Sequence, residues 1–362
     1  MAAKKKHIVC FHLFNNYTGS PKVLSQVIKG LIDKGYRVDL VTNKTEGFLS
    51  NIKGVNYKYI YYSWNKNKLI TLLYFIWAQV HLFIISFFEY KKSKSIFYIN
   101  TLLPFGAAIA GKILKKEVIY HVHEHYLTNG LLYRIYSFTF IKCANRVIFV
   151  SNYISNNYNI KIDSIVIYNS LDLEYEIKAK EYLKKRVKKQ ETILMISSLK
   201  TYKGIYQLIK LSDLTPHISF ELVLSCTPKE LDLFSKSNRI PSNLKVYSCQ
   251  KDLHKFYQRS IICLNLSLPN MCVETFGLTI LEAMTYGIPV IIPPVGGPIE
   301  LVDDGFNGFH VDSRDLILLK KRIDLLLENN ELYMEFSERA LIKSKEFNYK
   351  DMINKVENFL TK

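Results

Sequence analysis

The chain has 362 residues, of which 48% are hydrophobic and 22% charged. This composition excludes a disordered or low-complexity protein, and the length is that of two globular domains. The formal net charge is +17, and residues 1–172 carry most of it, with 22 Lys and Arg against 8 Asp and Glu. Such a basic half favours an anionic partner, for which nucleic acid, phospholipid and a phosphorylated substrate are the candidates.

Six cysteines are scattered along the chain without a Cys-x-x-Cys pair. This pattern argues against a disulfide framework or a structural zinc site and favours a reducing compartment. The N-terminus has a basic start followed by a short, interrupted apolar run. We therefore expect a buried first strand there and no cleaved signal peptide.

Patterns of buried strands alternate with helical stretches along most of the chain. The predicted strands are Ile8–Leu13, Arg37–Thr42, Ser95–Asn100, Val118–His123, Val147–Val150, Ile193–Ser197, Phe220–Ser225, Leu244–Tyr247, Ile261–Leu266 and Pro289–Ile292. This alternation is typical of α/β proteins with parallel sheets. Because the strands form two runs of about five, we predict two doubly wound domains rather than one barrel.

A highly charged stretch with little apolar content separates the two runs of strands. We interpret residues 173–190 as a partly helical linker between an N-terminal domain, 1–172, and a C-terminal domain, 191–345. Residues 346–362 look helical and form the last predicted element.

One apolar segment stands apart from this pattern. Residues 69–88 contain 20 residues without a formal charge, a length that fits a membrane span. Gln79 and His81 lie in its middle, both flanks are basic, and it falls between strands of one domain. These features favour a partly buried helix or a helix at the bilayer interface, with its basic flanks against anionic head groups, over a true span.

The densest motif lies at residues 273–312. Glu274 and Glu282 flank Thr275-Phe276-Gly277 and a helical stretch, and Gly296-Gly297-Pro298 is predicted to open another helix. Backbone N–H groups at helix N-termini make anion sites that suit a diphosphate. If the segment were helical throughout, the two carboxylates would lie about 12 Å apart. Hydrolytic carboxylate pairs are about 5–9.5 Å apart, so this pair suits hydroxyls on two parts of one ligand, such as a ribose and a second sugar.

The alternative without a ligand is that Glu282 is a solvated helix residue and that the glycines only turn the chain. For an isolated pair of Glu residues that alternative would be favoured. Here the two carboxylates, both Gly turns and the strand–helix order occur together, so we favour a binding site.

This segment resembles the retaining glycosyltransferases of family 4, whose GT-B fold has two Rossmann-like domains facing each other across a cleft. Their signature is E-x-F-G-x-x-x-x-E-A-M-x-x-G-x-P-V, followed by G-G-x-x-E and G-x-x-G. Every position is matched here, ending at Gly305 and Gly308. Leu199–Gly204 resembles the family's L-x-x-x-K-G phosphate loop, and His123 ends a strand as the family's active-site His does. One departure is Ser197-Ser198, where many members have Gly-Arg.

The resemblance implies roles for individual residues. Cationic Lys203, with Lys200 in place of the missing Arg, would neutralise the departing nucleoside diphosphate. Glu282 would hold the ribose, Glu274 the transferred sugar, and His123 a sugar hydroxyl near the reacting centre. The implied catalytic residues are Glu274, His123 and Lys203; the implied donor-binding residues are Gly19, Lys200, Lys203, Glu274, Thr275, Phe276, Gly277, Leu278 and Glu282. The sequence contains no Asp-x-Asp, which agrees with a mechanism that needs no metal and no cofactor beyond the nucleotide sugar.

The predicted function is therefore retaining transfer of a hexosyl or N-acetylhexosaminyl group from a nucleotide-diphosphate sugar, with UDP favoured and GDP next. In this family the N-terminal domain binds the acceptor and the C-terminal domain binds the nucleotide sugar. In this fold the C-terminal helix, here 346–362, often crosses back to the N-terminal domain. The basic N-terminal half and the segment 69–88 suggest a lipid-linked glycan acceptor and an anionic membrane surface. This predicts a cytoplasmic enzyme, peripheral on the inner face of the cell membrane, in capsule, O-antigen or lipopolysaccharide synthesis.

Two alternatives compete with this prediction. The first is a basic, GT-B-like protein that binds nucleic acid or membranes without transferase activity, although the sequence offers no recognised nucleic-acid-binding module. The second is a hydrolase that holds a metal on the His-x-His pair of His121 and His123. We expect instead that His121 packs inside, that His123 faces the cleft and that His125 lies in a loop.

Overall fold

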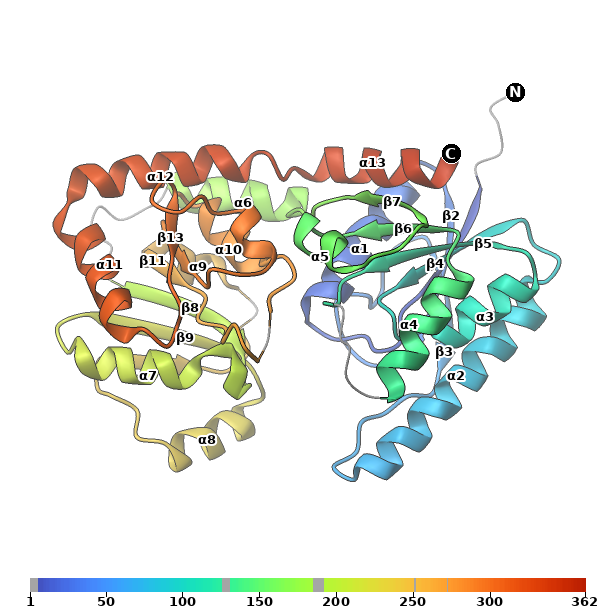
Figure 1. Ribbon diagram of the computed structural model, residues 1–362, viewed down its shortest axis with the longest axis horizontal. Coiled ribbons are helices and arrows are strands. Elements are labelled where there is room, and N and C mark those ends of the chain that lie inside the picture. Colours follow the sequence, from blue (N-terminus) through green and yellow to red (C-terminus); the bar gives the residue numbers. More distant parts are fainter. Residues whose placement is uncertain (1–5, 126–130, 185–191, 251, 272) are drawn as a thin grey trace. The chain divides into compact units, whose positions relative to one another are not determined.

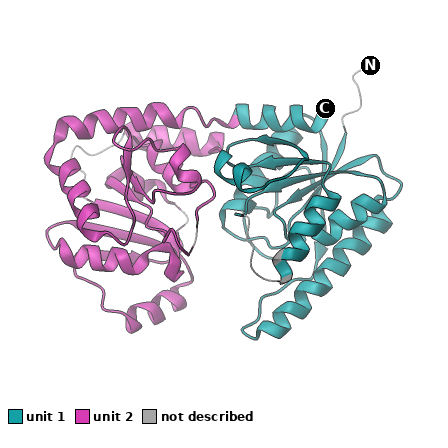
Figure 2. Ribbon diagram, in the orientation of Figure 1, with its two compact units in different colours: residues 1–169, 350–362 teal, residues 170–349 magenta. Residues whose placement is uncertain are grey.

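The computed structural model describes residues 6–125, 131–184, 192–250, 252–271 and 273–362. By its internal contacts the chain divides into two compact units (Figure 2). Unit 1 comprises residues 1–169 and 350–362, and unit 2 comprises residues 170–349. Each unit is built on one parallel β-sheet with helices in its connections (Figure 1).

Unit 1 contains a seven-stranded sheet in the order β3-β2-β1-β4-β5-β6-β7. The strands are β1 (His7–Phe11), β2 (Arg37–Asn43), β3 (Val55–Ile60), β4 (Ser95–Asn100), β5 (Glu117–Val122), β6 (Arg146–Phe149) and β7 (Asp163–Val166). Every residue of β4 is buried, as expected for a parallel strand that is covered on both faces. The strand order reverses at β1, so the topological switch point lies between β1 and β4.

Helices cover both faces of this sheet. They are α1 (Gly19–Asp33), α2 (Lys68–Tyr90), α3 (Phe105–Ile113), α4 (Leu131–Cys143), α5 (Asn152–Asn157) and α13 (Tyr349–Thr361). The first and last of them pack together: a Cβ on Gly30 of α1 would lie 2.6 Å from Ile353 of α13. On the other face Phe75 of α2 contacts Phe105 of α3 and Tyr136 of α4, so α2, α3 and α4 form one layer (Figure 1).

Unit 2 contains a six-stranded sheet in the order β10-β9-β8-β11-β12-β13. The strands are β8 (Thr192–Ser198), β9 (Ser219–Ser225), β10 (Leu244–Tyr247), β11 (Ser260–Leu264), β12 (Val290–Ile292) and β13 (Gly308–His310). Its helices are α6 (Leu173–Lys184), α7 (Ile205–Leu214), α8 (Pro228–Ser237), α9 (His254–Arg259), α10 (Leu278–Met284), α11 (Leu316–Glu328) and α12 (Asn330–Ser344). Ile193, Leu222 and Ile262 belong to the core cluster of this unit.

All ten predicted strands are present, but the sheets have seven and six strands rather than about five each. The missed strands are β3, β7 and β13. Much of β3 and β7 is exposed or only partly buried, and β13 has three residues. Their polar or short sequences therefore lack the continuous apolar run of a central parallel strand. Residues 173–184 of the predicted linker form α6, and the rest of it lies outside the described residues.

Candidate functional site

The switch point of unit 2 lies between β8 and β11, which are neighbours in the sheet. In parallel α/β sheets, ligands bind outside the carboxyl ends of the strands at such a point. A 3₁₀ turn, η1 (Thr201–Lys203), follows β8, and the loop after β11 leads through Glu274 into α10. Lys203 and Glu274 therefore come from the two loops at this switch point.

Lys203 and Glu274 form an ion pair. The Nζ atom of Lys203 lies 2.6 Å from Oε2 of Glu274, and the side chains are 20% and 26% exposed. Gly204, with φ of +79°, allows η1 to approach this loop, because a Cβ there would lie 2.0 Å from the carbonyl oxygen of Leu266. The pair combines a cation and a carboxylate in partly buried surroundings, where charges interact more strongly than in water.

The double glycine of the motif packs against the backbone beside Glu274. The N–H of Gly297 donates to the carbonyl of Glu274 at 2.9 Å, and a Cβ on Gly297 would lie 2.1 Å from the carbonyl oxygen of Thr275. The predicted helix after Gly296-Gly297-Pro298 is wrong: the chain makes only the four-residue 3₁₀ turn η2 (Gly297–Glu300). Leu301, directly after this turn, is buried in the core.

Between the two carboxylates, Phe276 packs into the core and Gly277 sets the start of α10. Phe276 is buried and its ring contacts Phe347, so only its backbone is available to a ligand. Gly277 has φ of +101° and precedes α10, which begins at Leu278. That backbone angle is outside the helical region, so Glu274 is not part of the helix that carries Glu282. The helical spacing of the two carboxylates considered from the sequence is therefore wrong.

Glu282 is buried on α10, with 3% of its surface exposed. The Tyr257 hydroxyl donates to its Oε2 atom at 2.7 Å. The Tyr257 ring stacks on Tyr286, and the Tyr286 hydroxyl lies 2.5 Å from Nδ1 of His254. Glu282 is therefore not a solvated helix residue, and that alternative is wrong. Its Tyr257 hydrogen bond compensates the carboxylate for the loss of water.

Lys200 and Ser198 lie on the approach to η1. Ser198 is the last residue of β8, and Lys200 is exposed at the residue before η1. The structure thus places Lys200 and Lys203 at the two ends of one short turn. It gives no contact between Lys200 and Glu274 among the described residues.

A second polar cluster lies at the switch point of unit 1. His12 follows β1, Asn100 ends β4, and His123 follows β5. Nδ2 of Asn100 lies 3.0 Å from Nδ1 of His12 and 3.3 Å from the carbonyl oxygen of Ser20 near the start of α1. Oδ1 of Asn100 lies 3.0 Å from Nε2 of His123. Gly19, the first residue of α1, is next to Ser20 at this cluster.

These contacts define the tautomer of His123. A carbonyl oxygen only accepts hydrogen bonds, so the Asn100 atom facing Ser20 is the amide nitrogen, and its oxygen faces His123. Nε2 of His123 therefore carries the proton, and Nδ1 keeps its lone pair. Among the described residues, no hydrogen bond reaches Nδ1, which leaves it able to accept one from a hydroxyl group.

Burial keeps the histidines at this switch point uncharged near neutral pH. Burial lowers the pKa of His12 to about 4 and of His121 to about 3, and it holds the pKa of His123 well below its usual value. Glu124 accepts hydrogen bonds from the backbone N–H groups of Leu102 and His123. Burial outweighs these bonds and raises the pKa of Glu124 to about 7.

The neighbouring histidines do not form a metal centre in the structure. His121 is buried and its Nδ1 lies 2.7 Å from the Tyr98 hydroxyl, while His125 packs beside Tyr153. No group of three or more His, Cys, Asp or Glu residues is placed to hold a metal ion in the described parts of the chain. The metal-hydrolase alternative thus gains no support.

Sequence reasoning missed Asn100 and Glu124. Asn100 appeared only as the last residue of a predicted strand, and Glu124 only as the neighbour of His123. Polar residues at the carboxyl ends of central strands were the signal that could have found both. What the sequence could not show is that β1, β4 and β5 are adjacent.

Two parallel α/β units are the architecture of the GT-B fold class, and solved structures support this fold. Anabaena Alr3699/HepE, in complex with UDP and glucose, superposes with a TM-score of 0.79 at 19% identity, over 98% of this chain and 99% of that one. WaaG, a glycosyltransferase involved in lipopolysaccharide biosynthesis, gives 0.74 at 15% identity, over 98% and 99%. At these identities the likeness shows the fold alone.

Family models identify both halves of the chain. Residues 17–175 match Glycosyltransferase Family 4, and residues 178–342 match Glycosyl transferases group 1. The chain belongs to the group 1 glycosyltransferases of family 4. This confirms the predicted family and the predicted two-domain fold class.

Curated relatives match parts of the chain. An uncharacterised glycosyltransferase of Haemophilus influenzae is 28% identical over 47% of this chain and 49% of its own length. Sucrose synthase of Acidithiobacillus caldus is 39% identical over 19% of this chain and 9% of its own length. The matched region thus spans half or less of these two relatives.

Proposed function

We propose that this chain is a retaining glycosyltransferase that moves a hexosyl or N-acetylhexosaminyl group from a nucleotide-diphosphate sugar to a lipid-linked glycan. The setting would be cell-surface polysaccharide synthesis of the capsule or O-antigen type. The observation that carries the proposal is the Lys203–Glu274 pair at the switch point of unit 2, with the buried Glu282 on the helix that follows. Membership of the glycosyltransferase family supports the reaction class.

In this proposal Lys203 stabilises the leaving group. The bond between the sugar C1 and the diphosphate oxygen breaks, and negative charge grows on the diphosphate. A cation already positioned there stabilises this charge most in the transition state. Glu274 holds the Lys203 ammonium in place, and an ammonium has three donors, so it can serve a carboxylate and phosphate oxygens together. Lys200 is available on the same short turn.

The carboxylates and backbone would bind the rest of the donor. Glu274 takes hydroxyls of the transferred sugar, and Glu282 takes the ribose hydroxyls. Backbone groups of Gly277 and Leu278, at the start of α10, and of Gly19, at the start of α1, would donate to the phosphates. The contacts of Thr275 and Phe276 position this loop.

His123 would orient a sugar hydroxyl rather than carry charge. Its half-buried, neutral ring presents an unprotonated Nδ1. The new bond forms from the acceptor oxygen to C1 on the face that the diphosphate leaves. The acceptor proton passes to a phosphate oxygen of the departing group, so the reaction balances without an enzymatic base or a metal.

Donor, acceptor and location are also proposals. UDP is favoured and GDP comes next; the solved HepE complex with UDP and glucose supports that order by fold only. The lipid-linked acceptor is supported by the basic character of unit 1, which carries 25 Lys and Arg against 9 Asp and Glu. A protein that acts on such an acceptor would be peripheral on the inner face of the cell membrane.

Thermal unfolding with nucleotides tests the donor site. The full chain is heated with UDP, GDP, ADP or CDP, with EDTA present throughout, as wild type, as Glu282→Gln and as the control Glu338→Gln, which changes an exposed Glu on α12. A ligand at 100 times its Kd stabilises the folded state by about 2.7 kcal/mol. We expect UDP to raise the melting temperature of the wild type and of Glu338→Gln but not of Glu282→Gln.

Two results would overturn the proposal. If no nucleoside diphosphate stabilises the wild type at millimolar concentration, the chain is a GT-B-like protein without a donor site. If Glu282→Gln responds to nucleotide as the wild type does, the donor does not bind where we propose.

A further inference from the structure

The helix α2 is apolar on both its buried and its exposed sides. Its buried residues include Phe75, Ala78 and Leu82. Seven large apolar residues on the opposite side are 43–64% exposed: Leu69, Leu73, Ile76, Trp77, Val80, Ile84 and Phe88. We call these seven residues the α2 ridge. A helix on the surface of a globular protein normally turns polar residues to solvent, so the ridge indicates a partner that is itself apolar.

The ridge is long and has apolar neighbours. It runs from Leu69 to Phe88, and the 19 steps between these two residues correspond to about 28 Å along the helix axis. In the same helical layer, α4 exposes Leu132, Ile135, Phe138 and Ile141. Both tryptophans of the chain are in or near the ridge: Trp77 belongs to it, and Trp64, which is 67% exposed, precedes the helix. Exposed tryptophans are enriched where a protein meets the head-group region of a bilayer.

Positive charge borders the ridge at both ends. Residues 47–116 contain ten Lys and a single acidic residue, Glu89, which is paired with Lys58 at 2.6 Å. The exposed lysines at the ends of α2 are Lys66, Lys68, Lys91, Lys92 and Lys94. An apolar stripe with lysines beside it complements a bilayer surface with anionic lipids, where acyl chains and negative head groups lie at adjacent depths.

Polar contacts hold α2 in the fold at its middle and at its end. In its middle Oε1 of Gln79 accepts from the N–H of Gly106, at the start of α3, at 3.0 Å. Gly106 also lies so close that a Cβ there would be 2.1 Å from the carbonyl oxygen of Gln79. A helix tied to its neighbours in this way lies against the sheet and is not free to leave it.

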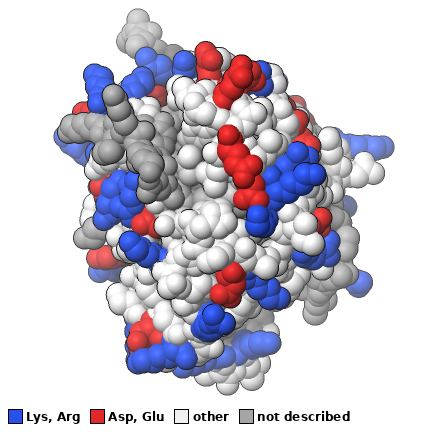
Figure 3. Space-filling model, turned by 90° about the vertical axis from the view of Figure 1, so that its left-hand side faces the viewer, with Lys and Arg blue, Asp and Glu red and all other residues white. Residues whose placement is uncertain are grey.

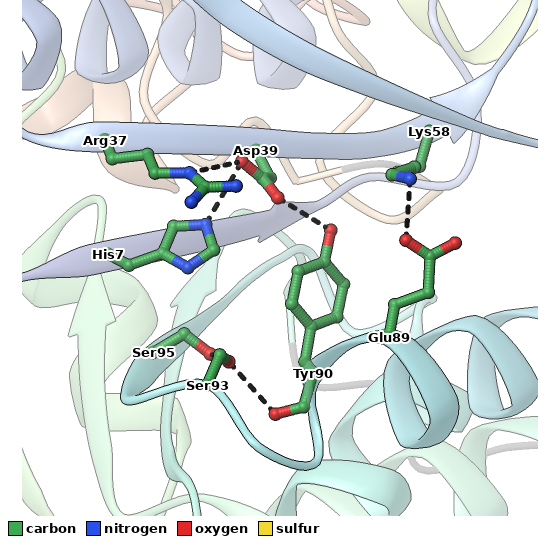
Figure 4. Close-up of polar contacts among 8 residues, drawn as sticks. All are labelled: His7, Arg37, Asp39, Lys58, Glu89, Tyr90, Ser93 and Ser95. Carbon is green, nitrogen blue, oxygen red and sulfur yellow. Dashed lines mark hydrogen bonds and ion pairs between the residues drawn. The ribbon is translucent and has the colours of Figure 1, made fainter.

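The end of α2 is tied to the sheet by a buried carboxylate (Figure 4). The Tyr90 hydroxyl donates to Oδ2 of Asp39 on β2 at 3.0 Å. His7 and Arg37 lie 3.1 Å and 3.6 Å from the other oxygen of Asp39. Extracting α2 to span a membrane would break the Tyr90 hydrogen bond to this buried carboxylate and separate the helix from β2. The helix therefore meets lipid as part of unit 1.

We propose that the α2 ridge docks the protein on an anionic bilayer, with the helix axis along the membrane surface. This deepens the proposed function, because it names the surface that would bring unit 1 to a lipid-linked acceptor. The occupant is lipid rather than a second copy, because lysines border the ridge at both ends and would repel their symmetry equivalents.

Vesicle flotation with the full chain tests the docking surface. The vesicles contain phosphatidylcholine alone or equal parts of phosphatidylcholine and phosphatidylglycerol. The ridge variant combines Leu73→Ser, Trp77→Ser and Phe88→Ser. The matched control combines Leu233→Ser, Ile317→Ser and Ile342→Ser, which removes three exposed apolar side chains of unit 2. We expect wild type and control to float with the anionic vesicles and the ridge variant to bind at least tenfold more weakly.

Intrinsic tryptophan fluorescence provides a second readout, because Trp77 belongs to the α2 ridge and Trp64 precedes the helix. Anionic vesicles should shift the tryptophan emission of the wild type to shorter wavelength, and high salt should reverse the shift. Equal flotation of wild type and ridge variant, or an unshifted emission, would overturn the proposal. So would a change of oligomeric state in the ridge variant without a change in flotation.

Nucleotide stabilisation in lipid-free solution keeps this test separate from the proposed reaction. The ridge variant should still be stabilised by the nucleotide that stabilises the wild type, which also shows that it folds. If the wild type floats but binds no nucleotide, the proposed function fails and the docking surface stands. If the wild type binds nucleotide but does not float, the docking surface fails and the proposed donor site stands.

Discussion

Units 1 and 2 share an architecture but carry charge in different places. Unit 1 has a net charge of +16, from 25 Lys and Arg and 9 Asp and Glu, yet its switch point holds the uncharged His12, Asn100 and His123. Unit 2 has 24 basic and 23 acidic residues, and its switch point holds the charged Lys203 and Glu274. On the face drawn in Figure 3, residues of both signs are interspersed.

If the donor binds as we propose, this difference teaches that net charge does not locate the binding site of a charged ligand. The proposed diphosphate site needs one or two cations in a fixed place, and Lys203 of the almost neutral unit would supply one. The basic excess of unit 1 is instead found in surface lysines such as those around α2. Variants of each unit test whether the fixed cation of unit 2 and the surface lysines of unit 1 have different roles.

The largest expected effect concerns Lys203. Lys203→Gln should lower kcat/KM for sugar transfer by about 100- to 1000-fold, as removal of one stabilising donor does in other enzymes. The matched control is Lys210→Gln, which changes an exposed Lys on α7. The assay is release of nucleoside diphosphate from the nucleotide sugar. An equal, small effect of both variants would show that unit 2 does not use a fixed cation.

The next effect concerns the backbone contact beside Glu274. Gly297→Ala places a Cβ 2.1 Å from the carbonyl of Thr275 and should lower the free energy of unfolding by about 1–3 kcal/mol through overpacking. Urea unfolding measures this loss, and nucleotide affinity should fall with it. Gly305→Ala meets no atom within 4 Å and should cost only the strain of a positive φ, about 1–2 kcal/mol. A loss confined to Gly305→Ala would contradict the packing described here.

A smaller effect is expected in unit 1. Asn100→Asp replaces the amide beside His123 with a carboxylate, which favours the imidazolium and raises the pKa of His123. Transfer activity should fall about tenfold, the factor that corresponds to the loss of one hydrogen bond worth about 1.4 kcal/mol, and its lower pH limit should move upward. Nuclear magnetic resonance of the His123 ring measures the pKa directly. An unchanged pKa would mean that Asn100 does not contact His123.

The smallest effect is on acid stability. The folded pKa values of His12 and His121, about 4 and about 3, lie below the ordinary 6.5, so the unfolded state binds more protons as the pH falls below 6.5. Stability should therefore decrease from pH 6.5 toward pH 4. Glu124, with a folded pKa of about 7 against 4.5, acts in the opposite direction, because protonation stabilises the fold as the pH falls through 7.

Glu124→Gln removes this opposing contribution. The melting temperature of the variant should fall more steeply with acid than that of the wild type. A shallower fall in the variant would show that Glu124 is ionised in the folded state at these pH values.

The sequence predicted the central strands well because they are continuous apolar runs. β4, which is buried at every residue, has the predicted bounds. The edge strand β3, with Lys58 and Tyr59 partly or fully exposed, has no such run, and its place in the sheet depends on pairing with β2. Glu274, Glu282 and Lys203 could be named from a motif, whereas the ion pair between Glu274 and Lys203 depends on the adjacency of β8 and β11. Tyr257 carries no local signal, because its role comes from a contact with Glu282, which is distant in sequence. Asn100 carries only the signal of a polar residue at a strand end, and its contact with His123 depends on the fold.

Hydrogen–deuterium exchange of the full chain with UDP tests the central claim most directly. Ligand binding slows exchange where backbone and side chains contact the ligand. We predict slower exchange at residues 199–205, 274–283 and 296–300 of unit 2, and no such change in residues 219–247, which form β9, α8 and β10. Uniform exchange with and without nucleotide, or protection confined to residues 219–247, would contradict the assignment of the donor site.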